Sequence, residues 1–255
     1  MTRILLWAIS VILLLSASCT PHRQMVYFQD KLMVGDTVPY NKPDYKVKHG
    51  DILYVRILTM EEENYQIFNS DDFDRSSYGS GQRNNISVYI NGYSVNQEGN
   101  IKMPVLGDVY VEGKSISEIT EHIQEKVDRY LIDATTIVKL VNFNVTVLGE
   151  VRRPGNYYIY DNQITVVDAL GLAGDMTDFG ERKVNIVRHT PQGAEFASLD
   201  MTDRRSYSSE YFYLQSNDIV YVEPTKAKRL GFSDFPFAVL FSAITTTILL
   251  LNYVN

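Results

Sequence analysis

The chain has 255 residues and carries 24 Lys and Arg against 31 Asp and Glu, a formal net charge of −7 at pH 7. This acidic balance argues against nucleic acid and anionic lipid headgroups as the main partners, because both are recognised by clustered Lys and Arg. The single Cys excludes a disulfide within the chain, so stability must come from packing and hydrogen bonds. Many of the Tyr residues stand beside Val or Ile, which favours strands.

The N-terminus is typical of a lipoprotein signal peptide over residues 1–18. Arg3 precedes an apolar run from Ile4 to Leu15 that is too short to span a bilayer, and small residues lead into Cys19. Cys19 is therefore the candidate lipidation site. The alternative is an ordinary secretion signal with an incidental Cys, because Ser16 stands where a lipoprotein usually has Leu. Residues 19–44 have no sustained period and predict an extended lead.

A first folded unit is predicted over residues 45–142. It opens with a strand at Tyr45–Lys48, a turn at Gly50-Asp51 and a strand at Ile52–Leu58. Residues 59–85 are acidic and then rich in Ser, Gly and Asn, which predicts a long solvated loop.

The middle of this unit contains further strand signals and the clearest helix. Strand pieces at 86–90 and 93–95 precede a turn at 97–100 and a strand at 101–105, and we expect these pieces to form a hairpin. Ser115 and Glu118 form a capping box, and an apolar stripe follows at spacings of three and four, made of Ile116, Ile119, Ile123, Val127 and Leu131. Such a helix covers one face of a sheet, and a strand at 135–141 follows it.

A second unit is predicted over residues 143–224. Residues 144–148 alternate as a strand, Pro154 and Gly155 suit a type II turn, and residues 157–160 return as a strand. A short helix over 166–172 stops at Gly174, and strands follow at 183–188, 195–199 and 218–223. The residues singled out as structural turns in the two units are Gly50, Asp51, Gly99, Pro104, Gly107, Gly149, Pro154 and Gly155.

The end of the chain carries no charge from Phe235 to Asn255. These residues predict a helix of roughly 31 Å, one hydrocarbon thickness, so we expect a C-terminal transmembrane helix over 232–254. A small and weakly polar stripe on it supplies candidates for helix packing or for lining a pore: Ala238, Ser242, Thr245, Thr246, Leu249 and Asn252. The alternatives are a buried core helix and a plain tail anchor.

The order of these features resembles the outer-membrane polysaccharide export family. The resemblance rests on the Tyr93-Ser94-Val95 strand, the Gly99 turn, Ile101 and Pro104, Leu106-Gly107, the capped helix, the Val-rich strand and Gly149-Glu150-Val151-Arg152-Arg153-Pro154-Gly155. It covers roughly residues 45–224 and implies an α+β chain. A polysaccharide-export α/β domain over 45–142 would be followed by a soluble-ligand-binding β-grasp domain over 143–224 and by the C-terminal helix.

The resemblance also implies a function and an assembly. It implies a ring of about eight identical subunits whose terminal helices form a barrel across the outer membrane. The protein would be an outer-membrane lipoprotein with its main body in the periplasm, exporting capsular or extracellular polysaccharide delivered by an inner-membrane copolymerase that is often a tyrosine kinase. The chain departs from well-known members in having a single recognisable β-grasp unit and a long acidic loop at 59–85.

The sequence gives little support to an enzyme or to a cofactor or metal site. It has no G-x-S-x-G elbow, P-loop or G-x-G-x-x-G after a strand, and its four His residues lack paired ligand spacing. Arg152, Arg153 and several Tyr (157, 158, 160, 207, 211 and 213) are possible polymer contacts, although exposed Arg is usually solvated and Tyr in strands usually packs.

Two rival functions remain open at this point. One is a periplasmic polysaccharide-binding or scaffold lipoprotein of an export complex that is not itself the pore. The other is a polysaccharide hydrolase, because two carboxylates far apart in a sequence can meet in the fold.

Overall fold

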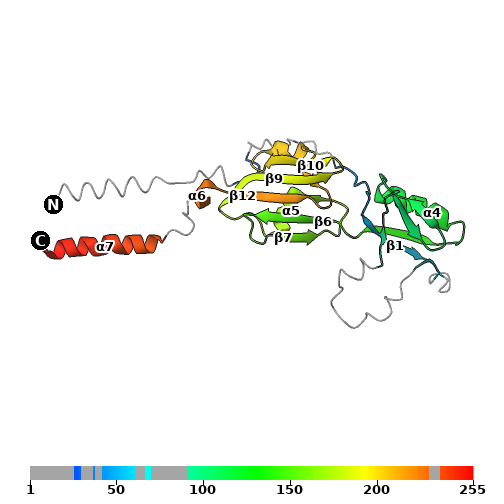
Figure 1. Ribbon diagram of the computed structural model, residues 1–255, viewed down its shortest axis with the longest axis horizontal. Helices are drawn as coiled ribbons and strands as arrows, with labels where there is room; N and C mark the ends of the chain where they lie inside the picture. Colours follow the sequence, from blue (N-terminus) through cyan, green and yellow to red (C-terminus); the bar gives the residue numbers. More distant parts are fainter. Residues whose placement is uncertain are drawn as a thin grey trace, which may run out of the picture.

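The structure is a computed structural model, and it describes residues 26–29, 37, 42–60, 67–69, 91–229 and 236–254. The expected signal peptide with Cys19 and the strand expected at 86–90 lie outside these residues. The mixed α+β class is confirmed. Figure 1 shows two sheet-containing bodies side by side, the first carrying α4 and the second carrying α5.

The first unit is built on an antiparallel sheet in the order β2-β1-β5. These strands are β1 (Ile52–Leu58), β2 (Tyr93–Ser94) and β5 (Thr135–Leu140). β1 lies between the other two and pairs with β5 over six residues, from Leu53 opposite Leu140 to Leu58 opposite Thr135. Its alternate residues Leu53, Val55 and Ile57 are buried, as the period of a half-buried strand requires.

Helix α4 (Ile116–Val127) packs on this sheet and has the expected cap. Glu118 N donates to Ser115 Oγ at 3.2 Å, and Ser115 N donates to Glu118 Oε2 at 2.6 Å. The four predicted stripe residues inside the helix are all buried, and Leu131 is buried beyond its end. The apolar face holds the helix on the sheet, and the box fixes where it starts.

Two strand predictions for this unit were wrong. Residues 101–105 do not pair with 93–95: β3 (Asn100–Met103) pairs with β4 (Gly107–Tyr110), and β2 pairs with β1 instead. Residues 45–48 form no strand. Their backbone is anchored differently, since Val47 N donates to Lys114 O and Gly113 N donates to Val47 O. Short apolar runs do not specify their partners, and tertiary contacts decided both cases.

Part of the expected solvated loop is packed into the first unit. Phe68 is 5% exposed, and the Asn69 side chain makes two hydrogen bonds to β1, with Ile57 N donating to Oδ1 at 2.9 Å and Nδ2 donating to Ile57 O at 2.8 Å. Asn69 thereby occupies the backbone groups that another strand would otherwise use.

The second unit has a sheet in the order β10-β9-β12-β6-β7 among the described residues. Its strands are β6 (Asn144–Gly149), β7 (Gly155–Tyr158), β9 (Gly180–Thr190), β10 (Gly193–Asp200) and β12 (Ile219–Pro224). The last strand, β12, lies in the middle, parallel to β6 and antiparallel to β9. This is the arrangement of a β-grasp fold. Smaller elements are β8 (Ile164–Thr165), β11 (Tyr213–Leu214), the 3-10 helix η2 (Arg204–Ser208) and α6 (Lys226–Arg229).

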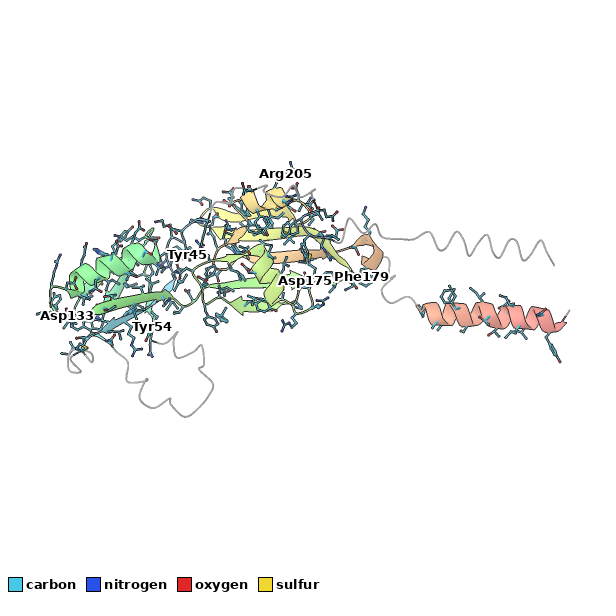
Figure 2. All side chains as sticks on the ribbon, turned by 180° about the vertical axis from the view of Figure 1, so that it is seen from behind. Tyr45, Tyr54, Asp133, Asp175, Phe179 and Arg205 are labelled. Atoms are coloured by element: carbon cyan, nitrogen blue, oxygen red, sulfur yellow. The ribbon has the colours of Figure 1, made fainter. Side chains whose placement is uncertain are left out.

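Helix α5 (Val166–Leu172) covers one face of this sheet (Figures 1 and 2). Thr165 and Asp168 form a second capping box at its start. At its end, Arg152 Nη1 donates to Gly174 O at 2.9 Å and Arg153 Nη2 donates to Leu172 O at 3.2 Å. These two arginines therefore complement the negative end of a helix, a role that their sequence context did not suggest.

The type II turn expected at Pro154 and Gly155 is also wrong. Gly155 is the first residue of β7 and has no positive φ. Left-handed backbone occurs instead at Gly149, with φ of 90°. A Cβ at Gly149 would lie 2.0 Å from Val222 O on β12, because the two backbones meet there in the parallel pair. Gly149 is required by this close approach as well as by its backbone angle.

Helix α7 (Phe237–Val254) is the last described element and is separate from the two sheets in Figure 1. Within the described residues, the structure has no helix whose length and apolar character suffice for crossing a membrane. The expected transmembrane helix over 232–254 is therefore not supported. The helix starts at Phe237 and has 18 residues, about 27 Å, which is less than the length expected from the sequence.

Replacing Gly149 with Ala tests the contact between β6 and β12. We expect Gly149→Ala to lower the free energy of unfolding by at least about 3 kcal/mol, because the added carbon meets a backbone oxygen in a left-handed conformation. The control Gly171→Ala lies in α5 with open space around it and should be neutral or stabilising by about 0.5–1 kcal/mol. Urea denaturation followed by circular dichroism measures both. Equal midpoints for Gly149→Ala and the unmodified protein would contradict this account.

Candidate functional site

The two units meet at Asn142, the middle of the three residues between β5 and β6. Its Oδ1 accepts from Ile52 N at 2.9 Å, and its Nδ2 donates to Gly50 O at 3.0 Å, so the side chain closes on the first unit. Its carbonyl accepts from Ser216 Oγ at 3.3 Å in the second unit. Asn142 thus makes hydrogen bonds with both units, which restricts how the units can move relative to each other.

An aromatic contact supports this joint. Phe143 is fully buried, and its ring stacks on Tyr45 with centroids 5.6 Å apart. Figure 2 shows Tyr45 between the two bodies. The Tyr45 hydroxyl donates to Asp51 Oδ2 at 2.8 Å, and Lys48 N donates to the same oxygen at 3.0 Å. Burial raises the pKa of the Tyr45 hydroxyl, and the neighbouring Asp51 raises it further. The hydroxyl therefore stays protonated and remains a donor.

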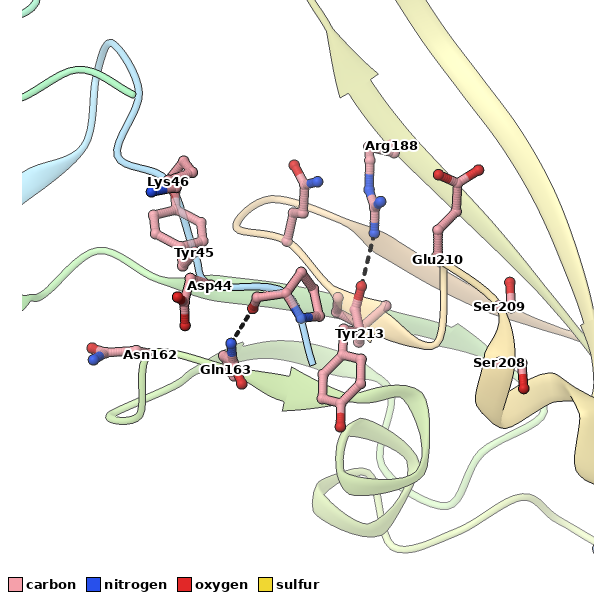
Figure 3. Close-up of a pocket in the computed structure, with 13 residues that line it drawn as sticks. Asp44, Tyr45, Lys46, Asn162, Gln163, Arg188, Ser208, Ser209, Glu210 and Tyr213 are labelled. Carbon is pink, nitrogen blue, oxygen red and sulfur yellow. Dashed lines mark hydrogen bonds between the residues drawn. The ribbon is translucent and has the colours of Figure 1, made fainter. Parts of the chain in front are cut away.

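A cleft of about 450 Å³ opens beside the joint (Figure 3). Residues 43–46, which lead into the first unit, form one wall. Residues 208–215 around η2 and β11 form the other wall, together with Arg188 of β9. The lining consists of Pro43, Asp44, Tyr45, Lys46, Asn162, Gln163, Arg188, Ser208, Ser209, Glu210, Tyr213, Leu214 and Gln215. Gln163 Nε2 donates to the carbonyl of Pro43 and connects two sides of this cleft. Most of the lining groups are polar, so the cleft suits a ligand that forms hydrogen bonds.

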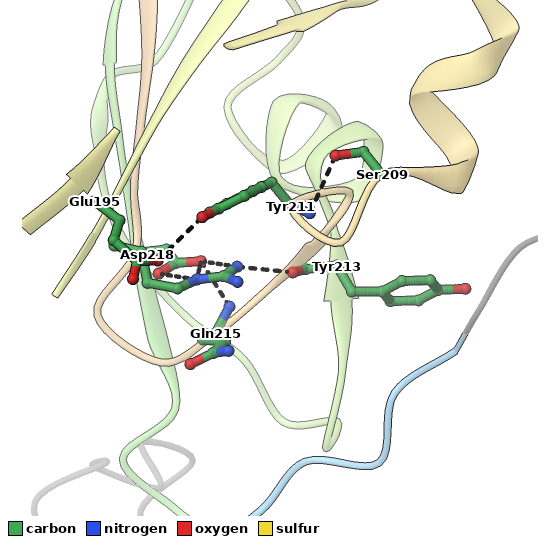
Figure 4. A network of polar contacts seen from close by, with 7 residues as sticks. Glu195, Ser209, Tyr211, Tyr213, Gln215 and Asp218 are labelled. Atoms are coloured by element: carbon green, nitrogen blue, oxygen red, sulfur yellow. Dashed lines mark hydrogen bonds and ion pairs between the residues drawn. The ribbon is translucent and has the colours of Figure 1, made fainter. Parts of the chain in front are cut away.

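Arg188, which lines the cleft, forms a buried ion pair with Asp218 within the polar network drawn in Figure 4. The Arg188 side chain is 9% exposed and that of Asp218 is 1% exposed. Arg188 Nε lies 3.2 Å from both carboxylate oxygens, and Nη2 lies 2.8 Å from Oδ2. Nη2 also donates to Tyr213 O at 3.0 Å, and Asp218 Oδ2 accepts from Gln215 N at 2.8 Å. These additional bonds compensate part of the cost of removing both charges from water.

Tyr211 covers the guanidinium from one side. The Arg188 guanidinium carbon lies 4.8 Å from the centre of the Tyr211 ring, a cation–π contact. The Tyr211 hydroxyl donates to Glu195 Oε2 at 3.0 Å, and this bond raises the pKa of the hydroxyl. Arg188 is therefore fixed by a carboxylate, a carbonyl and an aromatic ring, and its position does not depend on a ligand.

The lining offers amide, hydroxyl, carbonyl and charged groups to a ligand. Asp218 is 1% exposed and does not belong to the lining. Its oxygens accept from Arg188 and from Gln215 N. The arrangement therefore suits recognition of a ligand through hydrogen bonds.

The site residues predicted from the sequence lie elsewhere. The stripe residues Ala238, Ser242, Thr245, Thr246, Leu249 and Asn252 are all exposed on α7. Its hydroxyls donate within the helix, for example Thr245 Oγ1 to Phe241 O and Thr246 Oγ1 to Ser242 O, both at 2.8 Å. These donors therefore do not need a neighbouring helix as a partner. Cys19 lies outside the described residues.

The tyrosines considered as polymer contacts have different surroundings. Tyr211 covers Arg188, and Tyr207 packs between Phe28 and Phe212 with centroids 4.9 and 4.4 Å away. The Tyr157 hydroxyl donates to the carbonyl of Arg153. Tyr158 and Tyr160 are 53% and 82% exposed. Most of these rings therefore serve packing, as half-buried tyrosines usually do.

Sequence reasoning missed the residues that build the cleft. Arg188 was the last residue of one predicted strand, and Asp218 was the first residue of another, 30 residues later. The signal that could have identified Arg188 is its place in the strand alternation, on the same face as the buried residues Val184 and Ile186 of β9. A charged residue on the buried face of a strand requires a partner, but the sequence does not identify that partner.

Comparison with known proteins divides the chain into two matched regions at the joint formed by Asn142 and Phe143. Residues 39–141 match the family described as Polysaccharide biosynthesis/export protein, and residues 144–196 match the SLBB domain. The first folded unit therefore matches the polysaccharide export protein family, and the second matches the SLBB domain. The two matched regions end and begin on either side of Asn142 and Phe143, so the cleft lies between the unit that matches the export family and the unit that matches the SLBB domain.

Similar curated proteins carry export names. The chain is 28% identical over 196 residues to "EPS I polysaccharide export outer membrane protein EpsA" of Ralstonia nicotianae, covering 73% of the chain and 49% of that relative. It is 33% identical over 102 residues to "Exopolysaccharide production protein ExoF" of Rhizobium meliloti, covering 38% of the chain and 24% of that relative. The chain spans about half the length of the EpsA relatives that it matches.

Breaking the buried pair between Arg188 and Asp218 tests its structural role. We expect Asp218→Asn to lower the free energy of unfolding by about 3–5 kcal/mol, because it leaves a buried guanidinium without its compensating charge. The control Asp203→Asn breaks an ion pair with Arg205, whose side chain is 89% exposed, and should cost no more than about 1 kcal/mol. Urea titrations at pH 7 measure both. Similar losses for the two variants would show that burial of Arg188 and Asp218 has no special energetic role.

Proposed function

We propose that the chain is an outer-membrane component of capsular or extracellular polysaccharide export and that copies of it assemble into a channel. The observation that carries this proposal is the succession of an export domain and an SLBB domain in one chain. The names of the EpsA relatives support the outer membrane as its location. Cys19 would carry the lipid that attaches the chain to this membrane, with the two folded units in the periplasm.

The surface of α7 supports assembly. Its exposed apolar side chains include Val239, Phe241, Leu249 and Leu250, each 60–64% exposed. They point to several sides, and a helix that is apolar all round is normally covered by other protein or lipid. Copies of α7 packed against one another would cover these side chains. The small residues of the stripe, such as Ala238 and Ser242, would let the helices approach closely.

Transport of this kind needs no chemistry in the chain itself. The direction of movement would come from polymer synthesis and from an inner-membrane copolymerase, with which the periplasmic units would make contact. Selectivity would be loose and would depend on the width and lining of the ring. A closed ring of identical subunits requires a heterologous interface, in which two different surfaces of each copy meet.

Truncation at Asp234, which removes α7, tests the channel. We expect cells that carry only the truncated protein to lose surface polysaccharide, and the purified truncated protein to be monomeric by light scattering where the full chain is oligomeric. Thr247→Ser is the control, because it keeps the hydroxyl that donates to Ala243 O, and it should change neither readout.

The opposite results have distinct meanings. Normal surface polysaccharide with the truncated protein would exclude α7 as part of the conduit. A full chain that is monomeric in detergent would favour a periplasmic polysaccharide-binding or scaffold protein that is not the pore. Unchanged surface polysaccharide after deletion of the whole gene would contradict a role in export.

A further inference from the structure

The cleft between the two domains presents side-chain amides that the fold itself does not use. The amides of Asn162 and Gln215 line the cleft and make no hydrogen bond within the described part of the chain. Gln163 Oε1, also in the lining, is buried there without a partner among the described residues. Each amide group offers both donors and an acceptor, which matches ligands whose hydroxyls do both.

Arg188 adds a donor whose charge is already balanced. Nε and Nη2 are occupied by Asp218 and Tyr213, while Nη1 makes no hydrogen bond within the described residues. Because Asp218 neutralises the guanidinium, Nη1 gains little from an anionic ligand, whose approach would also be opposed by the nearby carboxylate. A neutral oxygen, such as a hydroxyl or an acetamido carbonyl, suits this donor better.

The remaining charges of the lining do not favour an anion either. Asp44 and Glu210 carry negative charge and Lys46 carries positive charge, which leaves an excess of negative charge once Arg188 is paired with Asp218. A site for an anionic ligand normally has an excess of Lys and Arg, and this cleft has none. Its volume of about 450 Å³ lies within the range of small-ligand sites, roughly 300–1,000 Å³.

We propose that this cleft binds a short stretch of uncharged sugar residues, held by Asn162, Gln215 and Nη1 of Arg188. The inference rests on the proposed function, because the exported polymer is the source of the ligand. Since the cleft lies between the export domain and the SLBB domain, an occupied cleft also links the two domains. Binding through a few hydrogen bonds at a solvent-exposed cleft is weak, which permits the polymer to move on.

The test uses the full chain in detergent, labelled with ¹⁵N. The probe is a partial hydrolysate of the surface polysaccharide of the same cells, separated into uncharged and anionic fragments of about four sugars, a length that fits a cleft of this size. We expect the uncharged fragments to shift the side-chain amide signals of Asn162 and Gln215 in NMR spectra, with affinity in the millimolar range. The variants Asn162→Ala and Gln215→Ala assign these signals.

The double variant Asn162→Ala with Gln215→Ala should bind at least about tenfold more weakly, because two hydrogen bonds are lost. Gln97→Ala is the matched control, since Gln97 is an exposed amide in the turn before β3 and does not line the cleft. It should bind like the unmodified chain. If the double variant does not fold, the shifts of the side-chain amide signals in the unmodified chain decide the test by themselves.

Three results would overturn the inference: unshifted amides with every fragment, shifts with anionic fragments only, or equal binding by the double variant. Its failure is distinguishable from failure of the proposed function. If deletion of the gene abolishes surface polysaccharide while the amides do not shift, the export role stands and the sugar site is wrong. If deletion leaves surface polysaccharide unchanged, the export role is wrong whatever the spectra show.

Discussion

Arg188 and Asp218 are both almost completely buried, and the surrounding chain is arranged to hold them. Removing two charges from water costs several kcal/mol for each ion, so the pair persists only with good geometry and extra hydrogen bonds. Those bonds come from the Tyr213 carbonyl and the Gln215 N–H. These hydrogen bonds and the ion pair hold the segment 211–218 against β9, and this segment contributes one wall of the cleft.

The other wall depends on the joint between the domains. Asn142 binds two backbone groups of the first unit through its side chain and the Ser216 hydroxyl of the second unit through its carbonyl. Tyr45 and Phe143 pack across the same place. A joint made of directional bonds and one aromatic contact limits bending without a large apolar interface. The cleft is consequently a property of two domains held at a set orientation, and neither domain alone would form it.

The proposed export role calls for a chain that recognises and conducts a polymer. The chain's conspicuous surfaces are a polar cleft without an excess of positive charge and an apolar helix with exposed side chains on several sides. The first is suited to hydroxyl-rich ligands, and the second is of a kind normally covered by other protein or lipid. Both properties fit the proposed passage of a polymer through an assembly of several copies, each copy contributing weak contacts.

Local signals in the sequence determined the helices and most strands. The Ser115 and Glu118 box and the apolar stripe defined α4, and alternation defined β1 and β6, because caps and periodicity act within a few residues. Tertiary structure alone decided that β3 pairs with β4, that Gly149 rather than Gly155 needs a left-handed backbone, and that Arg188 meets Asp218. These features involve residues that become neighbours only when the strands pair, and strand pairing depends on packing over the whole sheet.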